Sequence, residues 1–150
     1  MENANERALK LFVVLSRANK VLHEETNRLI SSKGLNPTEF AVLELLYHKG
    51  KQPIQKIGEK ILMRSGSMTY VINKLESNGF LQREVNSIDK RVTYVEITAQ
   101  GTQIMDSLFP GHAENISNLL SSLSSEEQDQ ATKLLQKLGI SIRDLSSEKS

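Results

Sequence analysis

The stretch PIQKIGEKILMRSGSMTYVINKLESNGFLQREVNSIDKRVTYVEITAQG, residues 53–101, decides the fold. Its apolar residues recur at helical spacing up to about residue 78 and then give way to two β-rich runs, 80–85 and 92–97. The segment therefore predicts two short helices joined by a turn at Met63–Ser65, followed by a hairpin. That order of elements is a helix-turn-helix with a β-wing.

The second of these helices, predicted over residues 66–78, has two different faces. Its core face is formed by residues at i, i+3, i+4 and i+7, namely Met68, Val71, Ile72 and Leu75. The opposite face carries small and hydrogen-bonding side chains, Gly66, Tyr70, Asn73 and Ser77, flanked by Thr69 and Lys74. Such a face suits the major groove of DNA, and the first turn suits phosphate. An ordinary solvated polar face is the alternative.

The loop between the two strands is basic. It runs from Asn86 to Val92, and Asp89 precedes Arg91 by two residues. At the tip of a hairpin, Lys90 and Arg91 are placed to reach a minor groove, where negative potential is concentrated. Asp89 is expected to orient the Arg91 guanidinium. The alternative is a surface ion pair of little energetic consequence.

Charge is unevenly distributed along the chain. Residues 49–94 hold nine Lys/Arg against four Asp/Glu, whereas the rest holds ten against fourteen, although the whole chain is only +1. Positive potential is therefore concentrated on the segment that the helix pattern assigns to DNA.

Long helices are predicted on both sides of this segment. Residues 5–32 are apolar over more than one face, which predicts packing against a second subunit. Asn36, with Pro37 next and Glu39 reaching back to it, predicts the start of a helix that ends near residue 48. Thr98 is expected to cap a helix of about 98–122 with a kink or break at Pro110. A capping box at Ser124 opens the last helix, which ends near residue 145.

Composition excludes several classes of protein. The chain has 150 residues and no cysteine, which rules out disulfides and thiol chemistry. No apolar run of membrane-spanning length and no signal peptide is seen, so a cytoplasmic location is expected. No catalytic or phosphate-binding motif is found, and neither an enzyme activity nor a cofactor is predicted. The three histidines, 25 and 64 residues apart, predict no metal site.

Residues 35–101 resemble the MarR family of bacterial winged-helix regulators. The resemblance is carried by 35–40, 57–59 and 71–79, and most specifically by Asp89-x-Arg91 followed by Thr98-x-x-Gly101. The flanking helices extend it over nearly the whole chain. Residues 35–50 are also similar to Firmicute repressors that control quinone and hydroquinone detoxification. Because cysteine is absent, any such sensing is expected to be non-covalent.

The resemblance implies a mainly α fold with a small β-hairpin, in one MarR-type domain over residues 1–150. It comprises a winged helix-turn-helix at about 35–98 and dimerisation helices at about 5–33 and 98–145. It also implies a homodimer that binds a palindromic operator in double-stranded DNA, usually as a repressor. The residues expected at DNA are Arg64, Ser65, Gly66, Ser67, Thr69, Tyr70, Asn73, Lys74, Asp89, Lys90 and Arg91.

Family members release DNA when a small phenolic or similar ligand binds between the dimerisation helices and the winged domain. By placement, the residues expected to contribute here are Phe12, His23, Phe40, Tyr47 and Phe109. Core packing is the competing role for each of them. Two other functions stay open at this point, namely a zinc-responsive regulator and a winged helix that binds another protein.

Overall fold

The computed structural model describes residues 3–61 and 65–149. The chain forms two compact units, Met1–Ala113 and Glu114–Ser150. The first unit contains the complete winged helix-turn-helix, so the candidate site can be described within it.

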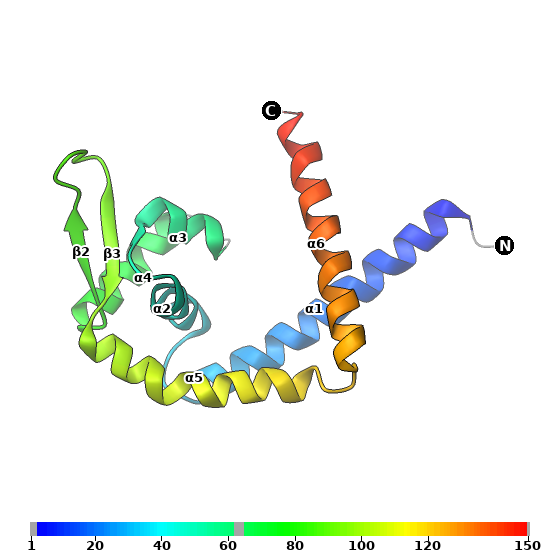
Figure 1. Ribbon diagram of the computed structural model, residues 1–150, viewed down its shortest axis with the longest axis horizontal. Coiled ribbons are helices and arrows are strands. Elements are labelled where there is room, and N and C mark those ends of the chain that lie inside the picture. Colours follow the sequence, from blue (N-terminus) through cyan, green and yellow to red (C-terminus); the bar gives the residue numbers. More distant parts are fainter. Residues whose placement is uncertain (1–2, 62–64, 150) are drawn as a thin grey trace. The chain divides into compact units, whose positions relative to one another are not determined.

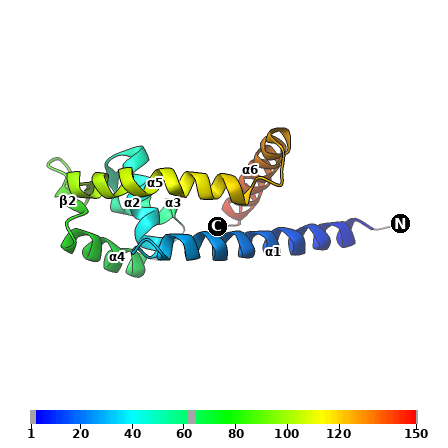
Figure 2. The ribbon, with the colours of Figure 1, turned by 90° about the horizontal axis from the view of Figure 1, so that it is seen from below.

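The first unit begins with a long helix, α1 (Ala4–Ser31), and then continues as a winged helix-turn-helix (Figures 1 and 2). Its elements are α2 (Pro37–Lys49), β1 (Gln52–Pro53), α3 (Ile54–Lys60), α4 (Ser65–Ser77), β2 (Leu81–Val85) and β3 (Thr93–Ile97). Helix α5 (Ala99–Leu119) follows and crosses the boundary between the units, and α6 (Ser125–Ser147) belongs to the second unit. The mainly helical class with a small sheet is confirmed.

Local capping explains where the helices begin. Asn36 accepts a hydrogen bond from the Glu39 N–H at 2.8 Å, and Pro37 occupies the first turn of α2. The second half of the predicted capping box is wrong, because the Glu39 carboxylate accepts instead from Lys74 of α4. The predicted cap of α6 is confirmed, since Ser124 and Glu127 bond reciprocally. Thr98 accepts from the Gly101 N–H at 3.1 Å at the start of α5.

The sheet has three strands where the sequence predicted a two-stranded hairpin. Its order is β1-β3-β2, with both pairs antiparallel, and Arg83 and Gln52 each lie opposite Val95. Pro53 is the N-cap of α3 and also forms part of β1 opposite Tyr94. Its φ of −62° and ψ of 144° are extended. An edge strand tolerates proline because the missing N–H is not needed for pairing.

The core of the first unit lies between the sheet and helices α2 to α5. It contains the predicted face of α4, Val42 and Leu43 of α2, and Ile57, Leu81, Val95 and Met105. Tyr47, which was expected to be buried, lies only partly buried at its edge. This burial fixes which side of α4 is left exposed.

A kink or a break was expected at Pro110, and the break is absent, because α5 runs continuously through this residue. Proline removes one helical hydrogen bond, but Pro110 and its neighbour Gly111 are exposed, and water can satisfy the freed carbonyl. Of the predicted turn before α4, Met63 and Arg64 lie outside the described residues. Ser65, which was expected in the turn, is the first residue of α4. Within the described ranges, no helix is long and apolar enough to cross a membrane.

Two glycines of α5 have different surroundings, so substitution by alanine is predicted to change the free energy of unfolding differently at each. A Cβ on Gly101 would lie 2.2 Å from the Phe80 carbonyl oxygen, whereas one on Gly111 would meet nothing within 4 Å. Gly101→Ala should therefore lower the free energy of unfolding by about 1–3 kcal/mol. Gly111→Ala should raise it by up to about 1 kcal/mol. Denaturant titration measures both, and equal effects would contradict the close packing at Gly101.

Candidate nucleic-acid interface

Helix α4 presents one apolar and one polar face, as the sequence predicted. Met68, Ile72 and Leu75 are buried. The side chains of Ser67, Thr69, Tyr70, Asn73 and Lys74 are exposed, and Tyr70 is 68% exposed. The polar side therefore faces outward on a helix whose other side is fixed in the core. Such an arrangement can place hydrogen-bonding groups at base edges.

A residue of the sheet, which the sequence did not single out, orients this polar face. Arg83 of β2 donates from its guanidinium to Asn73 Oδ1 of α4. Its Nε also lies 3.9 Å from a Glu76 carboxylate oxygen on the same helix. The amide NH2 of Asn73 is thereby left as the group pointing away from Arg83. Side chains two residues apart in a strand lie on the same face, so Arg83 lies on the face of the buried Leu81. This spacing was the signal in the sequence that could have placed Arg83 next to α4.

Lys74 is tied to α2. Its Nζ lies 3.0 Å from Oε1 of Glu39, and its side chain is 45% exposed. The hydrogen bond to the Glu39 carboxylate raises the pKa of Lys74 above its ordinary value. The ammonium that was expected to meet DNA is thus engaged by a carboxylate of the protein.

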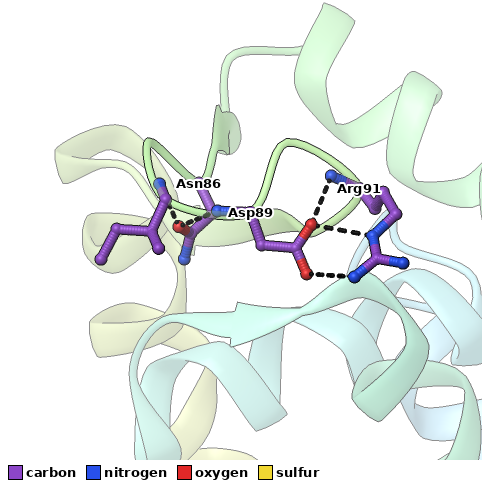
Figure 3. A network of polar contacts seen from close by, with 4 residues as sticks. Asn86, Asp89 and Arg91 are labelled. Carbon is purple, nitrogen blue, oxygen red and sulfur yellow. Dashed lines mark hydrogen bonds and ion pairs between the residues drawn. The ribbon is translucent and has the colours of Figure 1, made fainter.

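The wing loop is held in shape by its own side chains (Figure 3). Asn86 Oδ1 accepts from the backbone N–H groups of Ile88 at 2.8 Å and Asp89 at 3.0 Å. The two ends of the loop are joined by the Asn86 N–H and the Val92 carbonyl at 2.9 Å. Ile88 is 95% exposed in this loop. The turn therefore does not depend on packing against the core.

Asp89 orients Arg91, as the spacing predicted. Its Oδ1 accepts from Arg91 Nε at 3.0 Å and from the Arg91 backbone N–H at 3.1 Å, and its Oδ2 accepts from a terminal guanidinium nitrogen at 3.2 Å (Figure 3). The hydrogen bonds from Arg91 lower the pKa of Asp89 and raise that of Arg91. The Arg91 side chain nevertheless stays 91% exposed. Lys90 is also exposed, so both cations of the loop are accessible.

Three residues expected at DNA are only partly covered by these observations. Arg64 lies outside the described residues. Ser65 and Gly66 form the first turn of α4, where the structure describes the backbone but not the side chains. Their expected phosphate contacts remain predictions.

An aromatic cluster lies where α2 meets α5. We define it as Phe40, Tyr47, His48, Phe109 and His112. Ring centroids are 4.7 Å apart for Phe40 and His112, 4.5 Å for His48 and Phe109, and 6.0 Å for Tyr47 and Phe109. The Tyr47 hydroxyl donates to Asp106 of α5, and this hydrogen bond raises the pKa of Tyr47.

Three of the five residues expected at a ligand therefore come together, and two do not. Phe40, Tyr47 and Phe109 belong to the aromatic cluster, joined by two histidines that the sequence did not place there. Phe12 instead lines an open hollow on α1 with Asn5, Ala8 and Leu9. His23 is exposed on α1, and in the described part of the chain it makes no ring contact with the cluster.

Known proteins resemble the chain over the segment just described and well beyond it. The MarR family model matches residues 35–93. The HTH-type transcriptional regulator MhqR of Bacillus subtilis is 49% identical over 138 residues, which cover 92% of this chain and 95% of that protein. The chain belongs to the MarR family. It is a DNA-binding transcriptional regulator and not an enzyme.

Other known proteins are similar in sequence or in fold. The uncharacterized regulator YkoM of B. subtilis is 49% identical over 93% of this chain and 90% of its own. A mutant of Escherichia coli MarR, solved in complex with operator DNA, has a TM-score of 0.77 at 20% identity, covering 91% of this chain and 98% of that one. NadR, solved with 4-hydroxyphenylacetate, has a TM-score of 0.73 at 20% identity, covering 84% and 89%. These two structures share the fold.

The Asp89–Arg91 pair makes a prediction for titration of the wing. The pKa of Asp89 should lie below the ordinary value of about 3.9. Because Arg91 lowers the pKa of Asp89, the ion pair that orders the loop is fully formed at pH values above the ordinary pKa of the carboxyl. The pair is lost as the pH falls through the lowered pKa of Asp89. Arg91→Ala should raise the pKa of Asp89 towards the ordinary value, as measured by NMR of the side-chain carboxyl carbon.

Lys90→Ala is the matched control, because it removes an adjacent cation that forms no bond to Asp89. It should leave the pKa of Asp89 low. If instead Arg91→Ala left that pKa unchanged, the bidentate pair would not exist in solution.

Proposed function

We propose that the chain is a repressor that binds a palindromic operator as a homodimer and releases it when a small aromatic, phenolic or quinone-like ligand binds. The DNA-binding role is supported mainly by the exposed polar face of α4, together with a wing whose loop is held by its own hydrogen bonds and exposes two cations, Lys90 and Arg91. In this proposal α4 reads base edges in the major groove, and the wing contacts the neighbouring minor groove. The regulator acts in the cytoplasm, where its DNA target lies.

Side chains of α4 and the two cations of the wing are proposed to meet DNA. On α4, Thr69, Tyr70 and Asn73 meet base edges, while Ser67, the first-turn residues Ser65 and Gly66, and Arg64 just before the helix contact phosphate. In the wing Arg91 enters the minor groove, Lys90 lies along the backbone, and Asp89 holds Arg91 in orientation. Arginine is suited to this position because a narrow minor groove concentrates negative potential.

A homodimer is supported by apolar surface that each unit leaves exposed. On α1 of the first unit the exposed apolar residues are Leu9, Leu11, Phe12, Val13, Val14 and Val21. On α6 of the second unit they are Leu134, Leu135, Leu138, Ile140, Ile142 and Leu145. So many exposed apolar side chains on one helix are typical of a surface that packs against another chain. A two-fold dimer presents two α4 helices, which favours an operator with two-fold symmetry.

The effector proposal rests on the aromatic cluster and on the relatives. Rings from α2 and α5, together with the Tyr47 hydroxyl and the Asp106 carboxylate, offer stacking surfaces and hydrogen-bonding groups to an aromatic ligand. The solved NadR complex contains 4-hydroxyphenylacetate, a phenol. With no cysteine in the chain, binding would be reversible and non-covalent.

The role of the wing predicts a salt-dependent loss on Arg91→Ala. Affinity for a site selected from random duplexes should fall by about tenfold or more, and the slope of log K against log salt should become shallower by about 0.9. Fluorescence anisotropy at several salt concentrations measures both. Lys20→Ala removes an exposed cation of α1 and should change neither. An unaltered slope for Arg91→Ala would reject the wing assignment.

Reading by α4 predicts a change of sequence preference rather than of general affinity. Tyr70→Ala or Asn73→Ala should relax discrimination at particular base pairs, by about 1–3 kcal/mol for each lost base contact. Repeating the selection from random duplexes with each variant measures this. Ser77→Ala, at the far end of the same helix, is the comparison. Selected sites identical to those of the wild type would show that α4 does not read the sequence.

Dimerisation through α1 predicts a monomer when the exposed surface is made polar. Phe12 is 67% exposed, so Phe12→Asp removes no core contact of its own chain. The variant should show a monomer mass in light scattering and weaker binding to a palindrome, because two half-sites are no longer held together. Lys20→Asp on the same helix should stay dimeric. A dimer of unchanged stability in Phe12→Asp would exclude this part of α1 from the interface.

A further inference from the structure

Glu39 is the one charged residue that is buried among the residues the structure describes. It is 4% exposed and lies in the first turn of α2, just after the Asn36 cap. Its carboxylate receives Lys74 Nζ at 3.0 Å. A buried carboxylate without such a partner is strongly unfavourable. Lys74 is therefore required at this point by the interior of the protein, whatever it does at the surface.

The Glu39–Lys74 pair holds α4 from one side, and Arg83 of β2 holds it from another. Lys74 joins α4 to α2, while Arg83 of β2 bonds to the adjacent residue Asn73. Between these contacts the apolar face of α4 packs into the core, and apolar packing alone is non-directional. An ion pair to the buried Glu39 carboxylate adds a directional contact, although Lys74 itself is half-exposed, and so restricts rotation of the helix about its axis. The direction in which Tyr70 and Asn73 point thus depends on both contacts.

We propose that Lys74 is a positioning residue for sequence reading and does not contact phosphate. Held by Glu39, it sets the orientation of α4 on α2, and through α4 the orientation of the side chains that meet base edges. This inference rests on the proposed DNA-reading role of α4. It reassigns a residue whose place on the polar flank of α4 suggested a DNA contact.

The test compares full-length wild type with Lys74→Met, which keeps the length of the side chain, and with Glu39→Gln. Affinity is measured for the selected site and for an unrelated duplex, each over a range of salt. For Lys74→Met we expect the affinity for the selected site to fall about tenfold or more, because the side chains that contact the bases would no longer be correctly placed. Affinity for the unrelated duplex and both salt slopes should stay unchanged. Glu39→Gln should also lower the ratio of the affinity for the selected site to the affinity for the unrelated duplex, although Glu39 is buried inside the protein.

Two further variants separate positioning from other roles. Lys90→Met in the wing is the matched control for a phosphate contact and should lower the salt slope by about 0.9 on both duplexes. Lys74→Arg retains a cation for Glu39 and should recover most of the preference. A loss of stability alone would lower the active fraction equally for both duplexes, so the affinity ratio separates positioning from a merely structural role. Should Glu39→Gln fail to fold, the three lysine variants still decide the matter.

The proposal is overturned if Lys74→Met lowers the salt slope as Lys90→Met does and weakens both duplexes equally. It is also overturned if Lys74→Met leaves the affinity ratio unchanged. A wild type that shows no preference for any duplex would instead refute the proposed function itself, which is a distinguishable result.

Discussion

Burial of one face of α4 is the constraint on which the rest of the structure depends. Met68, Ile72 and Leu75 are inserted among residues of α2, α3, the sheet and α5, and this leaves the polar side of the helix exposed. The same core includes Leu81 at the start of β2 and Val95 in the middle of β3, so the wing projects from strands that pack against the helix it accompanies. Helix and wing are therefore fixed relative to each other by shared packing.

Polar contacts add orientation to what packing has placed. Arg83 and Glu39 hold α4 from the sheet and from α2, and Asn86 and Asp89 shape the wing from within. The first turn of α2 has a double role, because Glu39 bonds to α4 while the next residue, Phe40, contacts the His112 ring in the aromatic cluster. If the proposed ligand moved this turn, the movement would reach α4 through the Glu39–Lys74 pair and through the core that α2 and α4 share, which offers a short physical route between the two proposed sites.

The sequence predicted most of the fold because its signals were local. Helical periodicity gave the buried face of α4, capping residues gave the starts of α2 and α6, and the two-residue spacing gave the Asp89–Arg91 pair. What it missed depends on contacts between distant segments. Glu39 was assigned to its own helix cap but pairs with a residue 35 positions later, and Arg83 reaches Asn73 from another element. Strand β1 was missed because it is only two residues long and contains proline, so it has no periodic pattern from which a strand could be predicted.

The absence of cysteine permits a direct test of how the protein lies on DNA. An iron chelate attached at Ser67→Cys on α4, or at Ser87→Cys in the wing, cleaves the DNA strands nearest to it. On a selected duplex, the α4 probe should cut across the major groove at two places about one helical turn apart, and the wing probe should cut across the minor grooves that flank them. Cleavage by the α4 probe only outside the selected sequence, or by neither probe, would contradict DNA reading by α4 and the wing.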